Sequence, residues 1–388
     1  MNTLRLKIAL IVLTLFSYIH ADTKKIILDD SSLLEMVTPK NNKASDKSVD
    51  VVDAEGIIIL VHGTFASDTD WYLPDGKFLR AVEIEANKKN YKVVSFTWSG
   101  DLNNTARIRA AKHLAQLILT YPEKVKIEVV GHSHGGNVIN LASALLYNPI
   151  EDTARKHDTQ EIIKPFETEE KDQYQTVLAM IADLEQELIQ MEAHINSIQK
   201  PKPQTTSYYY SPHYPYTLQD KESAQKLLLE LKTAYQEVQD LLKTKNIVSG
   251  KTKNLIDCAY LLATPVNTKA WPPNYFVIKN LKNFYSTGDL IQTVVGTCDR
   301  IYPAHPQLVN LRIQTAKTAY THSKDNPGHS DIHVPFIGRW LLDIFENLKT
   351  LNVGNFDQCN YGMNGKITFH EDYSFPRFET VLDPLKSE

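Results

Sequence analysis

Residues 56–61, Gly-Ile-Ile-Ile-Leu-Val, form an unbroken apolar run. A strand with one solvated face would alternate apolar and polar residues, so this run predicts a strand buried on both faces, as in a parallel sheet. Segments 91–98 and 126–131 also have the composition of strands, and apolar residues fall at helical spacing over 75–89 and 104–122. This alternation predicts an α/β fold in which right-handed crossovers build an open, mostly parallel sheet.

The same alternation resumes near the C-terminus after a long interruption. Three strands and a closing amphipathic helix are predicted over 254–263, 283–286, 309–314 and 334–348. With 388 residues, the chain is longer than an ordinary single domain. We therefore expect one discontinuous α/β domain over 22–149 and 253–350, and a C-terminal tail over 351–388.

The interruption, residues 150–252, has a different pattern. Apolar residues follow a 4-3 spacing from Val177 to Ile198 and again from Ala224 to Leu241. Sustained spacing of this kind keeps one seam facing a partner helix, which predicts an antiparallel helical hairpin with a proline-rich tip. Five tyrosines gather in that tip: Tyr208, Tyr209, Tyr210, Tyr214 and Tyr216. They would either contact a membrane surface or a protein partner, or fold back as a cap on the α/β domain.

The N-terminal segment 1–21 has the order of a secretory signal peptide. Arg5 and Lys7 precede a twelve-residue apolar run from Ile8 to Ile19, and small Ala21 follows. Twelve helical residues rise about 18 Å, which is short of the roughly 30 Å hydrocarbon core. We expect a secreted or periplasmic protein, or a membrane-anchored one if the segment is not cleaved.

The net charge and the number of cysteines exclude several classes of protein. The net charge of −4 gives no basic excess that would indicate a nucleic-acid partner. Three cysteines are too few for a disulfide-framed scaffold, and no Cys or His spacing indicates a metal site. Cys258 lies in an apolar run and is expected to be a buried thiol, whereas Cys298 and Cys359 could pair.

The hexapeptide 131–136, Gly-His-Ser-His-Gly-Gly, lies between a predicted strand and a predicted helix. A nucleophilic serine in such a turn adopts strained backbone angles, and glycines two residues to either side, Gly131 and Gly135, avoid collisions. This context makes Ser133 the candidate nucleophile.

The strand at 56–61 continues into His62, Gly63 and Thr64. Acyl transfer needs two backbone N–H donors for the developing oxyanion. One expected donor is the residue after the nucleophile, His134. The other is the residue after the His-Gly pair, Thr64, with Phe65 as the next candidate. His62 is expected to shape this loop rather than to transfer protons.

Through Val61-His62-Gly63-Thr64 and the hexapeptide, the sequence resembles the α/β-hydrolase superfamily and its lipase/esterase-like members. The resemblance covers about 56–148 and 254–348, roughly half the chain. It implies a three-layer α/β sandwich, no cofactor, and a triad in the order serine, acid, histidine, with the histidine after the last strand.

Two segments match the acid and histidine positions that the resemblance implies. Asp289 ends the turn after the strand at 283–286, and Asp331 and Asp257 are its rivals. His329 lies between the predicted last strand and the closing helix, with His333 as the alternative base.

The sequence therefore predicts an exported serine hydrolase that cleaves carboxylic esters, of lipids or other acyl groups, through an acyl-enzyme. Thioesterase, amidase or acyltransferase chemistry would use the same residues. The alternative from another class is a non-catalytic α/β-hydrolase scaffold whose hairpin binds a partner or a membrane surface.

Overall fold

The computed structural model describes residues 54–67, 69–147, 177–199, 217–247, 252–268, 270–289, 291, 299–303, 305–318, 320–321, 324–343 and 363–380. Within these ranges, no helix combines the length and apolar character that crossing a bilayer requires. The segment predicted as a signal peptide, the five tyrosines of the tip, Cys298 and Cys359 lie outside the described residues.

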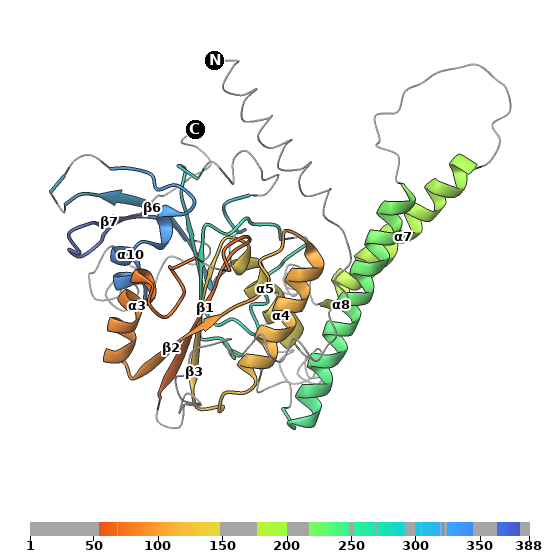
Figure 1. Ribbon diagram of the computed structural model, residues 1–388, viewed down its shortest axis with the longest axis horizontal. Helices are drawn as coiled ribbons and strands as arrows, with labels where there is room; N and C mark the ends of the chain where they lie inside the picture. The colour runs from red at the N-terminus through yellow and green to blue at the C-terminus, as the bar shows by residue number, and fades with distance from the viewer. Residues whose placement is uncertain are drawn as a thin grey trace, which may run out of the picture. The chain divides into compact units, whose positions relative to one another are not determined.

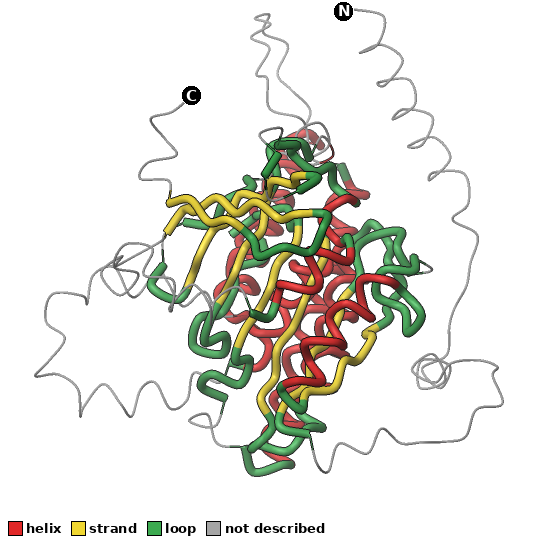
Figure 2. Tube along the Cα trace, turned by 90° about the vertical axis from the view of Figure 1, so that its left-hand side faces the viewer, coloured by secondary structure: helices red, strands yellow, loops and turns green. Residues whose placement is uncertain are grey.

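An eight-stranded sheet forms the centre of the described protein (Figures 1 and 2). The strands are β1 (Gly56–Val61), β2 (Tyr91–Phe96), β3 (Lys126–His132), β4 (Cys258–Leu262), β5 (Leu281–Tyr285), β6 (Leu308–Ala316), β7 (Met363–His370) and β8 (Arg377–Thr380). Their order is β2-β1-β3-β4-β5-β6-β7-β8. Strands β1 to β7 are mutually parallel, and β8 pairs antiparallel with β7. The predicted mostly parallel sheet is confirmed.

Helices cover both faces of this sheet. The four that pack on it are α3 (Lys77–Lys88), α4 (Asn104–Ile118), α5 (His134–Leu146) and α10 (Pro335–Leu341). Ile57, Ile59 and Val61 of β1 belong to the core with α4 and α5, whereas Ile58 and Leu60 belong to the core with α3 and α10. All five side chains are fully buried. The unbroken apolar run is thus explained, and the three-layer α/β sandwich is confirmed.

Two longer helices, α7 (Val177–Gln199) and α8 (Leu218–Thr244), lie between α5 and β4 in the sequence. They pack against each other, as Figure 1 shows. Glu192 pairs with Lys221 and Glu185 with Lys232, so the two helices run in opposite directions. Residues 200–216, which would join them, lie outside the described residues. The connection and its tyrosine-rich tip therefore stay predictions.

Helix α8 packs along the outer side of α4 and α5 (Figure 1). Arg109 of α4 pairs with Glu230, at 3.1 Å between Nε and Oε2. The Gln239 side chain donates hydrogen bonds to two backbone carbonyls at the C-terminal end of α5. Leu231 and Val238 are almost fully buried in the same core as α4 and α5. On this side of the sheet, α8 thus adds a further layer.

The prediction that residues 351–388 form a tail is wrong for the part that the structure describes. Strand β7 pairs parallel with β6 over eight residue pairs, and β8 extends the sheet further. The β7 sequence begins Met-Asn-Gly-Lys, which has the composition of a loop, whereas Ile367 and Phe369 further along are large, apolar and almost fully buried. Consequently β6 is not the last strand, and His329 follows the sixth strand of the sheet rather than the last.

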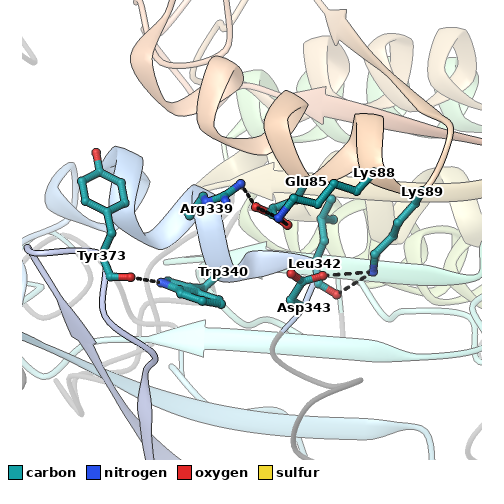
Figure 3. A network of polar contacts seen from close by, with 8 residues as sticks. All are labelled: Glu85, Lys88, Lys89, Arg339, Trp340, Leu342, Asp343 and Tyr373. Carbon is teal, nitrogen blue, oxygen red and sulfur yellow. Dashed lines mark hydrogen bonds and ion pairs between the residues drawn. The ribbon is translucent and has the colours of Figure 1, made fainter.

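Polar contacts join α3 to α10 on the opposite face of the sheet (Figure 3). The Glu85 side chain is 2% exposed and accepts from Lys88, at 2.8 Å, while it also pairs with Arg339 of α10. Lys89 pairs with Asp343 beyond the end of α10, at 3.4 Å. Because α10 follows the segment of His329 directly, these contacts hold that segment's C-terminal side on the core.

Candidate active site

Ser133 lies at the junction of β3 and α5, and its backbone is in a strained conformation. Its φ is 54° and its ψ is −131°, a combination that costs a non-glycine residue about 1–3 kcal/mol. Its N–H donates to the carbonyl of Leu262 at the end of β4, at 2.8 Å. The strand-to-helix turn that the hexapeptide predicts is therefore present, with the side chain nearly buried.

The motif glycines allow close approach of backbone to backbone at this turn. A Cβ atom on Gly135 would lie 2.4 Å from the carbonyl oxygen of Val61. One on Gly131 would lie 2.7 Å from a backbone nitrogen of the first turn of α5. One on Gly63 would lie 2.8 Å from the Cβ of Ser133, so the end of β1 touches the nucleophile turn. Larger residues at these positions would force the segments apart.

The two expected oxyanion donors lie on the segments that meet at Ser133. Thr64 is between Gly63, which touches the serine, and Phe65, whose N–H donates to Gly100 at 2.9 Å. The Phe65 amide is thus occupied. His134 begins α5, where the first N–H groups have no intrahelical acceptor and the helix dipole favours negative charge.

Hydrogen bonds of His62 hold the loop that contains Thr64 against the residues that follow β2. Its Nδ1 lies 2.8 Å from the carbonyl of Gly63, and its Nε2 accepts from the backbone N–H of Trp98 at 3.0 Å. The Trp98 indole in turn donates to the carbonyl of His62 at 2.8 Å. Burial lowers the pKa of His62, so the ring is neutral and structural. This agrees with the expectation that His62 shapes the loop.

Asp289 and His329, far apart in the sequence, are in direct contact. The His329 Nδ1 lies 2.7 Å from a carboxylate oxygen of Asp289, whose side chain is fully buried. Arg300 donates to the backbone carbonyl of Asp289 at 3.2 Å. A Cβ on Gly288 would lie 2.3 Å from the carbonyl of Asn326, so the acid loop and the histidine loop pack closely. The predicted acid and base are thus brought together.

The neighbours of Ser133 connect the nucleophile turn to this pair. The Nε2 of His132 lies 2.9 Å from the carbonyl oxygen of His329. The pKa of His134 is lowered to about 3, first by burial and then by the charges of Arg107 and His329. Both residues that flank Ser133 are therefore close to His329.

The alternative base, His333, has a different environment. Its ring stacks on Trp71 with the centroids 5.1 Å apart, and it meets the His132 ring edge-on at 4.6 Å. Burial lowers the pKa of His333 to about 4. The Asp289 carboxylate, by contrast, lies 2.7 Å from Nδ1 of His329.

The rival acids have structural partners. Asp331 accepts from the backbone N–H of Gly328 at 3.0 Å and so closes the turn that contains His329. Asp257 accepts from the backbone N–H of Ile127 at 3.1 Å, near the amino end of β3 and away from the serine. The charge of Asp331 also raises the pKa of His333, against the larger effect of burial, but the carboxylate hydrogen-bonded to His329 is that of Asp289.

Sequence reasoning missed two residues around the site, Arg300 and Trp71. Arg300 lies eleven positions after Asp289 and anchors its backbone, and Trp71 packs against His132 and His333. No periodicity or spacing marks either residue, because each reaches the site through a loop. An aromatic or cationic residue in a loop carries no local indication of its tertiary partner.

The described residues include no group of three or more His, Cys, Asp or Glu side chains that could hold a metal ion. Cys258 of β4 is buried and unpaired, as expected, and burial raises its pKa to about 11. A thiol that stays protonated at neutral pH is a poor nucleophile. Among the described side chains, Ser133 is thus the candidate for nucleophilic chemistry.

Part of the chain matches a known protein family. Residues 52–168 match the family described as "Putative serine esterase (DUF676)". That range includes β1, the loop that contains Thr64 and the whole hexapeptide. A search of curated proteins finds no match.

Two solved structures show local likeness. One is a metagenomic carboxyl esterase, with 20% identity, 26% of this chain and 34% of that chain covered, and a TM-score of 0.19. The other is an extracellular α/β-hydrolase from a Paenibacillus species, described as sharing structural and functional homology with Tobacco Salicylic Acid Binding Protein 2. Its identity is 24%, with 23% of this chain and 35% of that chain covered and a TM-score of 0.17. This chain spans about a third of the length of each.

Proposed function

We propose that this chain is a serine hydrolase of the esterase-like α/β-hydrolase superfamily and that it cleaves carboxylic esters. The parallel sheet and the family match over residues 52–168 support the proposal. The observation that supports it most is the contact between Asp289 and His329 beside the strained turn of Ser133. A buried carboxylate that accepts from Nδ1 leaves Nε2 of the imidazole as the base.

In the proposed mechanism, the Ser133 hydroxyl attacks the ester carbonyl while His329 takes its proton. Asp289 holds the Nδ1–H tautomer and stabilises the imidazolium that forms. The backbone N–H groups of Thr64 and His134 bind the oxyanion of the tetrahedral intermediate. His329 then gives the proton to the departing alcohol, and water, activated by the same histidine, hydrolyses the acyl-enzyme.

Hydrolysis of p-nitrophenyl butyrate by three variants tests this proposal. We expect Ser133→Ala and His329→Ala each to lower kcat by about 10⁴-fold or more, and the double variant to be no slower than either, because the two groups act as a unit. Ser223→Ala, an exposed serine of α8, is the matched control and should keep wild-type activity. A folded Ser133→Ala protein with undiminished activity would reject the proposal.

A substrate panel distinguishes esters from the other acyl compounds that the same triad could cleave. The enzyme would be assayed on butyryl esters, thioesters and anilides of matched leaving-group pKa. We expect kcat/KM to be highest for the esters. A clear preference for the thioester or the anilide would keep the serine mechanism but contradict the ester assignment.

A further inference from the structure

His132 is the last residue of β3 and the immediate neighbour of Ser133, and the mechanism above gives it no role. It is 5% exposed, and its ring centroid lies 4.8 Å from that of His329. Its Nε2 lies 2.9 Å from the backbone carbonyl oxygen of His329. This contact spans 197 residues of sequence and joins the nucleophile turn directly to the histidine loop.

The partner atom determines the tautomer of His132. A carbonyl oxygen only accepts, so Nε2 must carry the proton and donate it. Burial, with smaller contributions from His333 and His329, holds the pKa of His132 well below its usual range, so the ring is neutral. Nδ1 then carries no proton and has a free lone pair. It is buried without a hydrogen-bond partner in the part of the chain that the structure describes.

The surrounding rings fix the orientation of this donor. Trp71 meets His132 edge-on with the centroids 5.7 Å apart, and His333 meets it edge-on from 4.6 Å. Trp71 also stacks on His333, so the three rings pack mutually. A packed imidazole has one usable direction for its N–H, and here that direction points at the His329 carbonyl.

We propose that His132 is a positioning residue, which holds the backbone of His329 against the nucleophile turn so that its imidazole reaches Ser133. The inference rests on the proposed function. His329 would then be held at two points, its Nδ1 by Asp289 and its main chain by His132. Misplacement of a catalytic group by about 1 Å can lower a rate about 100-fold, so the second point is expected to matter.

Two substitutions of His132 distinguish the loss of its N–H donor from a change in ring packing. His132→Phe keeps a planar ring without an N–H, whereas His132→Gln places an amide N–H near the position of Nε2. We expect His132→Phe to lower kcat by about 10- to 100-fold with KM within about twofold, and His132→Gln to recover most of the loss. The matched control is His305→Phe, since His305 is also buried and stacks on Tyr275 at 3.6 Å. It should keep wild-type kcat.

A spectroscopic measurement on the wild-type protein does not depend on how the variants fold. The ¹⁵N shifts of the His132 side chain at pH 7 should show a neutral ring with the proton on Nε2. A proton on Nδ1, or a cationic ring, would overturn the inference. So would a folded His132→Phe protein with wild-type kcat, whereas full activity of Ser133→Ala would instead overturn the proposed function itself.

Discussion

Ser133 keeps its strained backbone because its surroundings leave it no other conformation. Its N–H is bound by the carbonyl of Leu262, and Gly63 touches its Cβ. Two residues after Ser133, Gly135 packs on the backbone carbonyl of Val61. Strain of about 1–3 kcal/mol persists where neighbours over-determine a residue in this way, and such residues concentrate at functional sites.

Buried histidines make the folded protein sensitive to acid. Burial lowers the pKa of His134 to about 3 and that of His305 and His333 to about 4, and it lowers the pKa of His62 and His132 as well. In the unfolded chain the imidazole pKa is about 6.5. Between the folded and the unfolded pKa, the unfolded state therefore binds more protons than the folded state. The stability contributed by these neutral rings is therefore complete above about pH 6.5 and is lost as the pH falls towards 4 and below.

We expect the thermal midpoint of the wild-type protein to fall steeply between pH 6.5 and pH 4, and that of His333→Phe to fall less. Phenylalanine keeps the aromatic contact with Trp71 but cannot take up a proton. Differential scanning calorimetry across this pH range measures both slopes. Identical slopes for the two proteins would contradict the neutral, buried state of His333.

At the scale of elements, one buried carboxylate takes part in the contact between α3 and α10. Glu85 is 2% exposed and pairs with Arg339, so Glu85→Gln leaves that guanidinium without its counter-charge (Figure 3). We expect a loss of about 1–3 kcal/mol in the free energy of unfolding, measured in urea. Asp75→Asn breaks the exposed pair with Arg80 and should change stability little. Equal effects of the two changes would contradict this account.

A neighbouring pair of leucines tests whether α8 is part of the core. Leu231 is 1% exposed and packs with α4 and α5, whereas Leu229 on the same helix is 66% exposed. Leu231→Ala should lower the free energy of unfolding by about 2–4 kcal/mol, and Leu229→Ala by less than about 0.5 kcal/mol. Urea unfolding measures both. If Leu231→Ala costs no more than its control, α8 does not dock on the α/β domain.

The elements that sequence patterns predicted well are those whose burial is complete or periodic. The continuous apolar run at 56–61 indicates a strand that is covered on both faces. The repeated 4-3 spacing of apolar residues over 177–198 indicates a helix that packs against another helix. Strand β7 was missed because its first half, which contains Asn364 and Gly365, has the composition of a loop and leaves too short an apolar alternation to predict a strand. Its place in the sheet comes from pairing with β6, which no local pattern encodes.

Local pattern likewise found only part of the site. Ser133, Gly131 and Gly135 could be predicted from the sequence because the strand-to-helix turn requires a serine with glycines at fixed spacing. The choice between His329 and His333 stayed open in the sequence, since both lie in one loop four residues apart. The tertiary contact of Asp289 with His329 favours His329, and no sequence pattern encodes that contact.

At the scale of the whole described protein, the sheet gathers the candidate site at one edge. Thr64, Ser133, Asp289 and His329 follow β1, β3, β5 and β6, and carboxyl ends of parallel strands lie at the same edge. Helix α5, which begins at His134, is backed on its outer side by α8. Helix α8 therefore supports the helix that begins directly after Ser133.

Labelling with a fluorophosphonate probe, followed by mass-spectrometric mapping of the modified peptide, tests the central claim most directly. The probe reacts only with a serine that a neighbouring base activates. The account expects one label, on Ser133, in the wild-type protein and in Ser223→Ala, and none in Ser133→Ala. A folded wild-type protein that stays unlabelled, or a label that persists in Ser133→Ala, would contradict it.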